Sequence, residues 1–313
     1  ATPTSAATAA PTQPADDLLP APLYVLELGQ IARIERDGVS RRLLTEERVQ
    51  IEGVRPIAEF ALAAEAMAYI VGDLDADRLV AADALGAEPR TLYSEPGHEL
   101  SDPLFAPDGA TVLFRLLNNQ QPADQPSGIY RIDLAGGEPA LLRADDPVDD
   151  PVNPARAVSG YQPAAFSADG SGVLLLAGPA DDPEAGPSLW RADAATLAMA
   201  PLLPATFARA PAGLPDGARL FAVSLVRDAA GTATGATFQP VALPDGASAP
   251  TPLGEPFPEL LERALWAPGG AGVVAELSSE ERRSLLRWLP TGGEPVQLPS
   301  SEDGVVQLAW GAA

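Results

Sequence analysis

Four polar residues stand just upstream of aromatic residues that recur along the chain. The pairs are Asp102 with Phe105, Gln162 with Phe166, Arg263 with Trp266 and Gln307 with Trp310. One acid, one guanidinium and two amides provide neither a nucleophile beside a base nor a metal triad. We therefore expect these four polar side chains to line a central channel and to bind any small ligand there, and we assign no residue a catalytic role.

Three aspartates alternate in the stretch GDLDADRL, and carboxylates at such spacing are a weak calcium-site candidate: Asp73, Asp75 and Asp77. A calcium loop needs several oxygen ligands, but the glycine and distant glutamate of an EF-hand are missing here. Aspartates that favour a turn are the alternative interpretation. The sequence contains no recognisable cofactor-binding motif, so we expect no cofactor.

The chain has a single histidine, His98, and no cysteine. Thiolate chemistry and Cys/His zinc sites are excluded, and no Gly-x-Ser-x-Gly elbow accompanies the histidine. We expect His98 to be a surface loop residue rather than a catalytic base. The acidic segment from Asp145 to Asp150 is interpreted as a solvated loop, with a face for cations or basic partners as the alternative.

The charge balance is strongly acidic, with 20 basic and 43 acidic residues and a net charge of −23. Such a surface repels phosphate backbones and anionic lipid head groups, so nucleic-acid binding is not expected. A basic protein partner is electrostatically easier. No apolar run approaches the roughly 20 residues of a membrane helix.

The first 21 residues are rich in Ala, Thr and Pro and contain few large apolar groups. A segment of this composition cannot bury enough surface to offset its ordering entropy. We expect residues 1–21 to be a flexible tether and residues 22–313 to form the folded domain. The tether suits a spacer behind a membrane anchor that precedes Ala1; a frayed terminus is the alternative.

A repeat of about 50 residues organises the rest of the chain. Each unit carries a turn such as PDG, strand-like runs, a Gly-Gly turn and a short strand ending in Leu, as in residues 101–143. Six units are recognisable: 22–48, 55–95, 100–146, 160–206, 207–256 and 259–300. The recurring aromatics are interpreted as packing between neighbouring sheets.

The first unit has three strand-like runs, whereas VVQLAWG at the end of the chain repeats the first-strand pattern without its turn. The last segment would therefore supply the strand that the first unit lacks. Such splitting closes a ring of sheets and removes exposed edges. The sequence predicts an all-β, six-bladed β-propeller of four-stranded antiparallel blades, closed by the C-terminal strand joining the first blade.

The units resemble the propeller repeats of the TolB family. The third unit matches the family pattern at Pro103, Phe105, Pro107, Asp108 and Gly109, then at Ile129, Tyr130, Asp133, Gly136 and Gly137. The resemblance covers residues 22–313 and lacks a counterpart of the N-terminal domain of TolB. It implies a propeller that is commonly extracytoplasmic and acts as a protein-binding platform.

Two functions follow as hypotheses. The first is a non-enzymatic extracytoplasmic protein-binding or scaffold propeller in the periplasm or at the cell surface, for which a lipid-anchored accessory subunit of an envelope or membrane complex is one form. The second is a propeller hydrolase or lyase that acts on a sugar or lactone at the central channel. Several inward-facing acids or histidines with a bound metal would favour the enzyme.

Overall fold

The computed structural model describes most of the repeat region and none of the first 16 residues. The described ranges are 17–45, 56–73, 76–118, 125–145, 161–166, 170–177, 188–203, 219–227, 233–242, 251–252, 260–278, 284–300 and 304–312. Regular structure in these ranges is almost all β. The helical part is one 3₁₀ turn, Pro268–Gly270, which is far too short to be a membrane-spanning helix.

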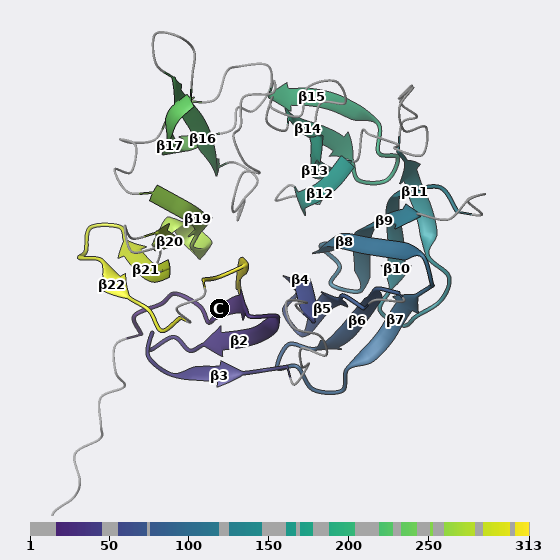
Figure 1. Ribbon diagram of the computed structural model, residues 1–313, viewed down its shortest axis with the longest axis horizontal. Coiled ribbons are helices and arrows are strands. Elements are labelled where there is room, and N and C mark those ends of the chain that lie inside the picture. The colour runs from purple at the N-terminus through teal and green to yellow at the C-terminus, as the bar shows by residue number, and fades with distance from the viewer. Residues whose placement is uncertain are drawn as a thin grey trace, which may run out of the picture.

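Five four-stranded antiparallel sheets surround a common axis (Figure 1). The first blade contains β23 (Gln307–Trp310), β1 (Leu23–Glu27), β2 (Gln30–Ile34) and β3 (Arg41–Leu43). The second contains β4 (Ile57–Leu62), β5 (Ala66–Val71), β6 (Arg78–Asp83) and β7 (Arg90–Ser94). The third contains β8 (His98–Phe105), β9 (Thr111–Asn118), β10 (Gly128–Asp133) and β11 (Ala140–Ala144).

The fourth blade contains β12 (Tyr161–Phe166), β13 (Gly172–Ala177), β14 (Ser188–Asp193) and β15 (Met199–Leu203). The last blade contains β19 (Leu260–Trp266), β20 (Gly272–Ser278), β21 (Ser284–Pro290) and β22 (Val296–Gln297). In all five, the strands are joined in sequence by hairpins, apart from the contribution of β23 to the first blade. The fold is thus an all-β propeller with four-stranded antiparallel blades.

The prediction of six four-stranded blades is wrong, because the structure has five. The fifth repeat unit instead forms a three-stranded sheet of β16 (Arg219–Arg227), β17 (Ala233–Ala242) and β18 (Thr251–Pro252). The sequence that was expected to begin this unit, from Phe207 to Gly217, is rich in Ala, Pro and Gly. Proline removes a ladder donor and glycine weakens a strand, so this composition favours a strand less than the matching part of the other units does. Residues 204–218 lie outside the described ranges.

The C-terminal strand joins the first blade, as the sequence predicted. Strand β23 pairs antiparallel with β1, with Leu23 opposite Trp310 and Leu26 opposite Gln307. We call this junction, Leu23–Leu26 with Gln307–Trp310, the seam. The seam is the place where segments nearly 300 residues apart in sequence share one sheet.

The hydrophobic core lies between neighbouring sheets. Strand β1 is buried at every position, and its alternate side chains point to opposite faces of its sheet. Leu23 and Val25 pack in a cluster with the last blade, whereas Tyr24 and Leu26 pack in a cluster with the second. A strand that is covered on both faces is apolar throughout, which explains the continuous LYVL and AMAYIV runs.

The recurring aromatic residues take part in this packing, which confirms their interpretation. Phe105 is buried between the second and third blades, and Phe166 packs against the cluster between the third and fourth. At the seam, Trp310 lies edge-on to Trp288 with ring centroids 5.8 Å apart. Such edge-to-face pairs add to the stabilisation that burial alone provides.

The residues just before β1 pack against the first blade. Leu19 is only 1% exposed, and its backbone N–H donates to the carbonyl of Arg36 at 2.9 Å. Asp17 forms an ion pair with Arg36 at 2.9 Å. The packed part of the first blade therefore includes residues before Pro22.

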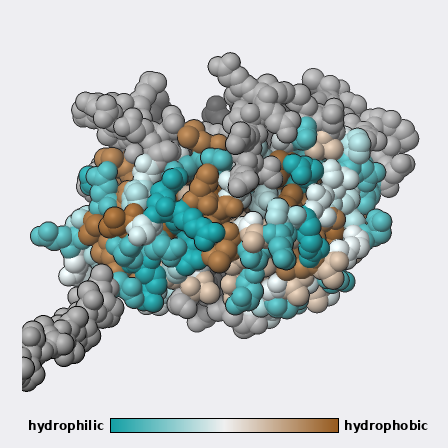
Figure 2. Space-filling model, turned by 90° about the horizontal axis from the view of Figure 1, so that it is seen from below, coloured by the Kyte–Doolittle hydropathy of each residue, from teal (hydrophilic) through white to brown (hydrophobic). Residues whose placement is uncertain are grey.

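The outer surface mixes polar and apolar residues. Figure 2, which views the molecule from below Figure 1, shows hydrophobic residues scattered among hydrophilic ones. The large hydrophobic side chains that are most exposed come from several different blades: Leu28, Val39, Leu43, Leu85 and Leu141. Single exposed apolar residues are ordinary on a protein surface and indicate no binding site by themselves.

Candidate functional site

The innermost strand of each four-stranded blade carries one recurring polar position. We define the inner position as the third residue before the end of that strand, which is Gln307 in β23, Glu59 in β4, Asp102 in β8, Pro163 in β12 and Arg263 in β19. Four of these strands have a register irregularity beside this position. A β-bulge bends a strand and redirects a side chain, so the inner residues point differently from their strand neighbours.

Gln307 joins the first blade to the second. Its side-chain oxygen accepts a hydrogen bond from the N–H of Phe60 at 2.8 Å, and its side-chain NH₂ donates to the carbonyl of Phe60 at 2.7 Å. The amide thus replaces the missing backbone partner of a residue that is 1% exposed. The residue predicted as a channel ligand is used to hold two blades together.

Glu59 performs the same task between the second and third blades. Its carboxylate oxygen Oε2 accepts a short hydrogen bond from the backbone N–H of Asp102. Asp102 adopts φ = 54°, a left-handed conformation that is uncommon for a residue with a side chain. Its own carboxylate accepts a hydrogen bond from the Ser101 hydroxyl at 2.7 Å. The carboxyl groups of adjacent inner strands are therefore near enough for the charge of Asp102 to act on Glu59.

Burial raises the cost of ionising both carboxyl groups. Burial, followed by the charge of Asp102, raises the pKa of Glu59 to about 7. Burial also raises the pKa of Asp102, although the Ser101 hydroxyl and the charge of Arg115 oppose the shift. Burial therefore favours the protonated form of both carboxyl groups, and the charge of Asp102 adds to this effect at Glu59.

Arg115 links this pair to an acid that we expected to be solvated. Its Nη2 donates to Asp145 at 2.9 Å, and the Asp145 side chain is only 2% exposed. Asp145 is therefore part of a buried ion pair within the third blade, which corrects its interpretation as a solvated loop residue. The remaining acids of that segment, residues 146–150, lie outside the described ranges.

Arg263 joins the last blade to the segment that leads into β23. Its Nη1 donates to the carboxylate of Glu276 at 2.7 Å and to the backbone carbonyl of Val305. Glu276 is 3% exposed and accepts a second hydrogen bond from the N–H of Val305 at 2.8 Å. The Nη1 end of the guanidinium is therefore bonded to a buried carboxylate, Glu276, whose orientation is fixed by Val305.

Gln162 differs from the other three predicted ligands. It is an exposed residue of β12 and makes no hydrogen bond to another described residue. The next residue, Pro163, occupies the inner position and has no N–H to donate. Glu59 accepts a hydrogen bond from the backbone N–H of Asp102. Asp102 cannot accept the equivalent hydrogen bond from the fourth blade, because Pro163 has no N–H. Gln162 is thus an exposed side chain on the innermost strand of the fourth blade, and its role as a ligand-binding residue stays a prediction.

Sequence reasoning missed Glu59, the partner of Asp102. The rule that identified the other residues was an aromatic a few positions downstream, and in β4 the corresponding residue is Leu62. Phe60 is present but lies two residues earlier, which hid the correspondence. Counting back from the end of the strand instead of from the aromatic identifies Glu59.

Two of the three alternating aspartates lie near each other, because the Asp77 carboxyl accepts a hydrogen bond from the backbone N–H of Asp73. Asp77 accepts a hydrogen bond from the backbone N–H of Leu100 at 2.9 Å, so it connects the second and third blades. Asp73 is exposed, and Asp75 lies outside the described ranges. Within those ranges, no three His, Asp or Glu side chains are grouped closely enough to hold a metal ion.

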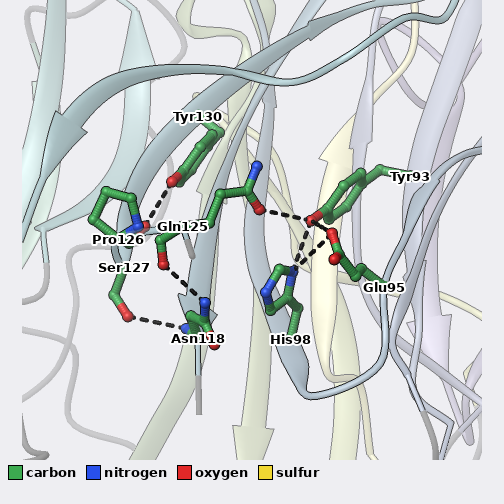
Figure 3. A network of polar contacts seen from close by, with 8 residues as sticks. All are labelled: Tyr93, Glu95, His98, Asn118, Gln125, Pro126, Ser127 and Tyr130. Atoms are coloured by element: carbon green, nitrogen blue, oxygen red, sulfur yellow. Dashed lines mark hydrogen bonds and ion pairs between the residues drawn. The ribbon is translucent and has the colours of Figure 1, made fainter. Parts of the chain in front are cut away.

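His98 is buried rather than on the surface, which corrects the sequence interpretation. It begins β8 with 5% exposure, and its Nδ1 lies 2.7 Å from the hydroxyl of Tyr93 (Figure 3). The same hydroxyl lies 3.0 Å from Glu95 and 3.1 Å from the side-chain oxygen of Gln125. A hydroxyl has one hydrogen to donate, so the network is satisfied when Nδ1–H donates to Tyr93 and Tyr93 donates to Glu95. The Gln125 amide must then present its NH₂ group.

Comparison with known proteins places the fold but not the function. No family model and no curated protein sequence matches this chain. Among solved structures, TolB from Acinetobacter baumannii is similar with a TM-score of 0.64 and 20% identity, covering 93% of this chain and 66% of that chain. This chain thus corresponds to slightly less than two thirds of that protein.

Two other solved structures show how widely this architecture is used. An oligogalacturonate lyase in complex with manganese is similar with a TM-score of 0.53 and 13% identity, covering 87% of this chain and 74% of that one. A nidogen/laminin complex gives a TM-score of 0.53 and 11% identity, covering 86% and 89%. At these identities the similarity extends to the fold alone, which is a β-propeller like that of TolB structures.

Proposed function

We propose that this protein is a non-enzymatic, extracytoplasmic binding propeller that holds a basic segment of a protein partner at the inner ends of its second, third and fourth blades. The binding residues are Glu59 and Asp102, with Gln162 beside them. The remaining predicted ligands, Arg263 and Gln307, hold neighbouring blades in place and complete the ring of polar groups.

The observation that carries the proposal is the carboxyl pair of Glu59 and Asp102. Their raised pKa values mean that the free protein keeps two acids together at a free-energy cost. A guanidinium or ammonium group placed between them would relieve that cost by allowing both acids to ionise. The net charge of −23 also favours the approach of a basic partner.

The location and the tether belong to the same proposal. The Ala/Thr/Pro-rich composition of residues 1–16 suits an extended spacer that separates a propeller from a membrane anchor. The packing of Leu19 against the first blade would fix where such a spacer leaves the domain. Fractionation of cells that produce the natural protein tests this part, because an anchored protein is released from membranes by detergent and not by salt.

Quantitative capture from a detergent extract of the source envelope tests the binding function. The immobilised full chain is compared with Glu59→Gln/Asp102→Asn and with Glu65→Gln/Glu138→Gln, which removes two exposed acids away from the inner strands. We expect the same protein to be enriched on the wild type and on the exposed-acid control, and to be lost from the inner-strand variant and at high salt. Equal enrichment on all three would contradict the proposal.

A second candidate function is catalysis on a sugar acid at the same place. It is favoured by the pKa of Glu59, because a carboxyl that titrates near 7 suits proton transfer at neutral pH. The fold similarity to an oligogalacturonate lyase names the first substrate to try. Formation of unsaturated product from oligogalacturonate, with and without added manganese, would support this candidate if Glu59→Gln abolished it. No product under either condition would count against it.

A further inference from the structure

Arg263 uses one edge of its guanidinium to bond Glu276 and Val305, and its side chain is partly exposed. A guanidinium has five N–H donors: two on Nη1, two on Nη2 and one on Nε. Both Nη1 hydrogens are used, one on Glu276 and one on the carbonyl of Val305. Because the Glu276 carboxylate is itself fixed by the N–H of Val305, the orientation of the guanidinium plane is set before any ligand arrives.

The other edge carries the Nε–H and one Nη2–H side by side. No acceptor among the described residues bonds to either nitrogen, and the Arg263 side chain is 40% exposed. Strand β19 is the innermost strand of the last blade and lies beside β23 and the three-stranded sheet. The innermost strand of the last blade therefore carries a rigid pair of parallel donors that no other described residue uses.

We propose that this edge of Arg263 is a subsite for a carboxylate group. The spacing of the Nε–H and Nη2–H matches the two oxygens of a carboxylate, which they bind in a bidentate manner. A single monoanion is the appropriate charge, because the guanidinium already shares its charge with Glu276. The subsite is on the same ring of inner strands as the proposed protein-binding site, but it does not depend on that function.

Two sources can supply the group, and the probes separate them. One is the free C-terminus of a peptide, represented by N-acetyl-trialanine and its C-terminal amide. The other is a small organic acid, represented by propionate. Trp266 lies three residues further along the same strand and Trp310 lies on β23, so indole N–H signals in NMR spectra of the full chain report binding.

The comparison uses Arg263→Gln, Arg263→Lys and the control Arg42→Gln, which changes an exposed arginine on the outer strand β3. We expect saturable binding of N-acetyl-trialanine in the millimolar range, and binding of the amide that is about tenfold weaker or more. The Arg263→Gln variant should lose at least about tenfold in affinity, while Arg42→Gln should match the wild type. If propionate also binds, the subsite recognises a carboxylate group in any small acid. If only N-acetyl-trialanine binds, the subsite recognises the C-terminus of a peptide.

Arg263→Lys keeps a donor and a charge but has no parallel fork, so it should fold and still bind several times more weakly than the wild type. This variant keeps the test valid if Arg263→Gln loses stability with its bonds to Val305 and Glu276. Equal affinity for the acid and its amide, or unchanged affinity in Arg263→Lys and Arg263→Gln, would overturn the inference. Glu59→Gln/Asp102→Asn should bind these probes normally, which separates failure of this subsite from failure of the proposed function.

Discussion

Residues at one position of successive blades do similar work with different chemistry. Gln307 uses a neutral amide, Glu59 a carboxylate and Arg263 a guanidinium, and each reaches the backbone of the next blade. The backbone groups that they reach lie on the inner edge strands β4 and β8 and in the segment that leads into β23, where no neighbouring strand of the blade supplies a partner. A polar side chain that satisfies such a group removes a desolvation cost of about 1–3 kcal/mol.

Gln307→Ala should destabilise the protein by about 2 kcal/mol, because it leaves the N–H and carbonyl of buried Phe60 without their partner. Urea unfolding measures the change. Gln297→Ala removes an exposed glutamine of the last blade and is the matched control, which should stay within about 0.5 kcal/mol of the wild type. Equal effects of the two substitutions would show that the Gln307 contacts contribute nothing.

Glu59 should make stability depend on pH between about 4.5 and 7. Its folded-state pKa is raised, so the folded protein binds more protons than the unfolded chain in this window and stability falls as pH rises. Glu59→Gln removes the contribution of Glu59 to this slope and keeps a side-chain oxygen for the N–H of Asp102, whereas the contribution from the raised pKa of Asp102 remains. The difference in free energy of unfolding between the variant and the wild type should therefore shift in favour of the variant by up to about 3 kcal/mol from pH 4.5 to pH 8. Parallel stability curves for the two proteins would contradict the assignment.

In several turns between strands, an aspartate carboxylate accepts hydrogen bonds from the backbone N–H groups of the turn. Asp193, at the end of β14, accepts hydrogen bonds from the N–H of Ala195 at 3.1 Å and from the N–H of Thr196 at 2.8 Å. Asp83 closes the corresponding turn of the second blade through Leu85 and Ala87. Carboxylates of this kind satisfy turn amides that have no ladder partner, which accounts for the aspartate that ends the third strand of these units.

Asp193→Ala should lower the melting temperature at pH 7, and the difference from the wild type should shrink as the pH is lowered. Hydrogen bonds from Thr196 lower the pKa of Asp193, so its contribution is present above the usual carboxyl pKa of about 4 and disappears as the folded group becomes protonated. Calorimetry from pH 7 to pH 3 follows the effect. A difference that stayed constant over this range would point to backbone propensity and not to the carboxylate.

The whole molecule depends on the seam. Strand β23 completes the first blade, and Trp310 joins the cluster that holds the last blade against it. A closed ring has no free sheet edge at this point, so opening it exposes two blades at once.

Removing residues 305–313 should therefore lower stability far more than their number suggests, with loss of cooperative unfolding and rapid proteolysis of the first and last blades. A chain that begins at Asp17 is the control, and we expect it to unfold like the full chain because Leu19 and the first blade are intact. Limited proteolysis and thermal unfolding measure both. A truncated chain as stable as the full one would show that the seam is dispensable.

The sequence indicated the repeat, the seam and the packing role of the aromatics, because periodic patterns report directly on which side chains are buried. The number of four-stranded blades was wrong because residues 207–256 retain the repeat length without strand-forming residues in their first part. His98 was misplaced because a lone polar residue among turn residues gives no sign that Tyr93 will cover it. The contact between Glu59 and Asp102 joins different repeat units, and no local pattern specifies such a contact.

Site-specific photo-crosslinking tests the central claim most directly, that a partner binds at the inner strands. A photoreactive phenylalanine analogue replaces Gln162 on the innermost strand β12 or, as the control, Leu141 on the outer strand β11, and both residues are exposed. After irradiation of the source cells, we predict one protein adduct from position 162 that disappears when Glu59→Gln/Asp102→Asn is introduced, and none from position 141. An adduct that forms equally from position 141, or no adduct from position 162, would contradict the claim.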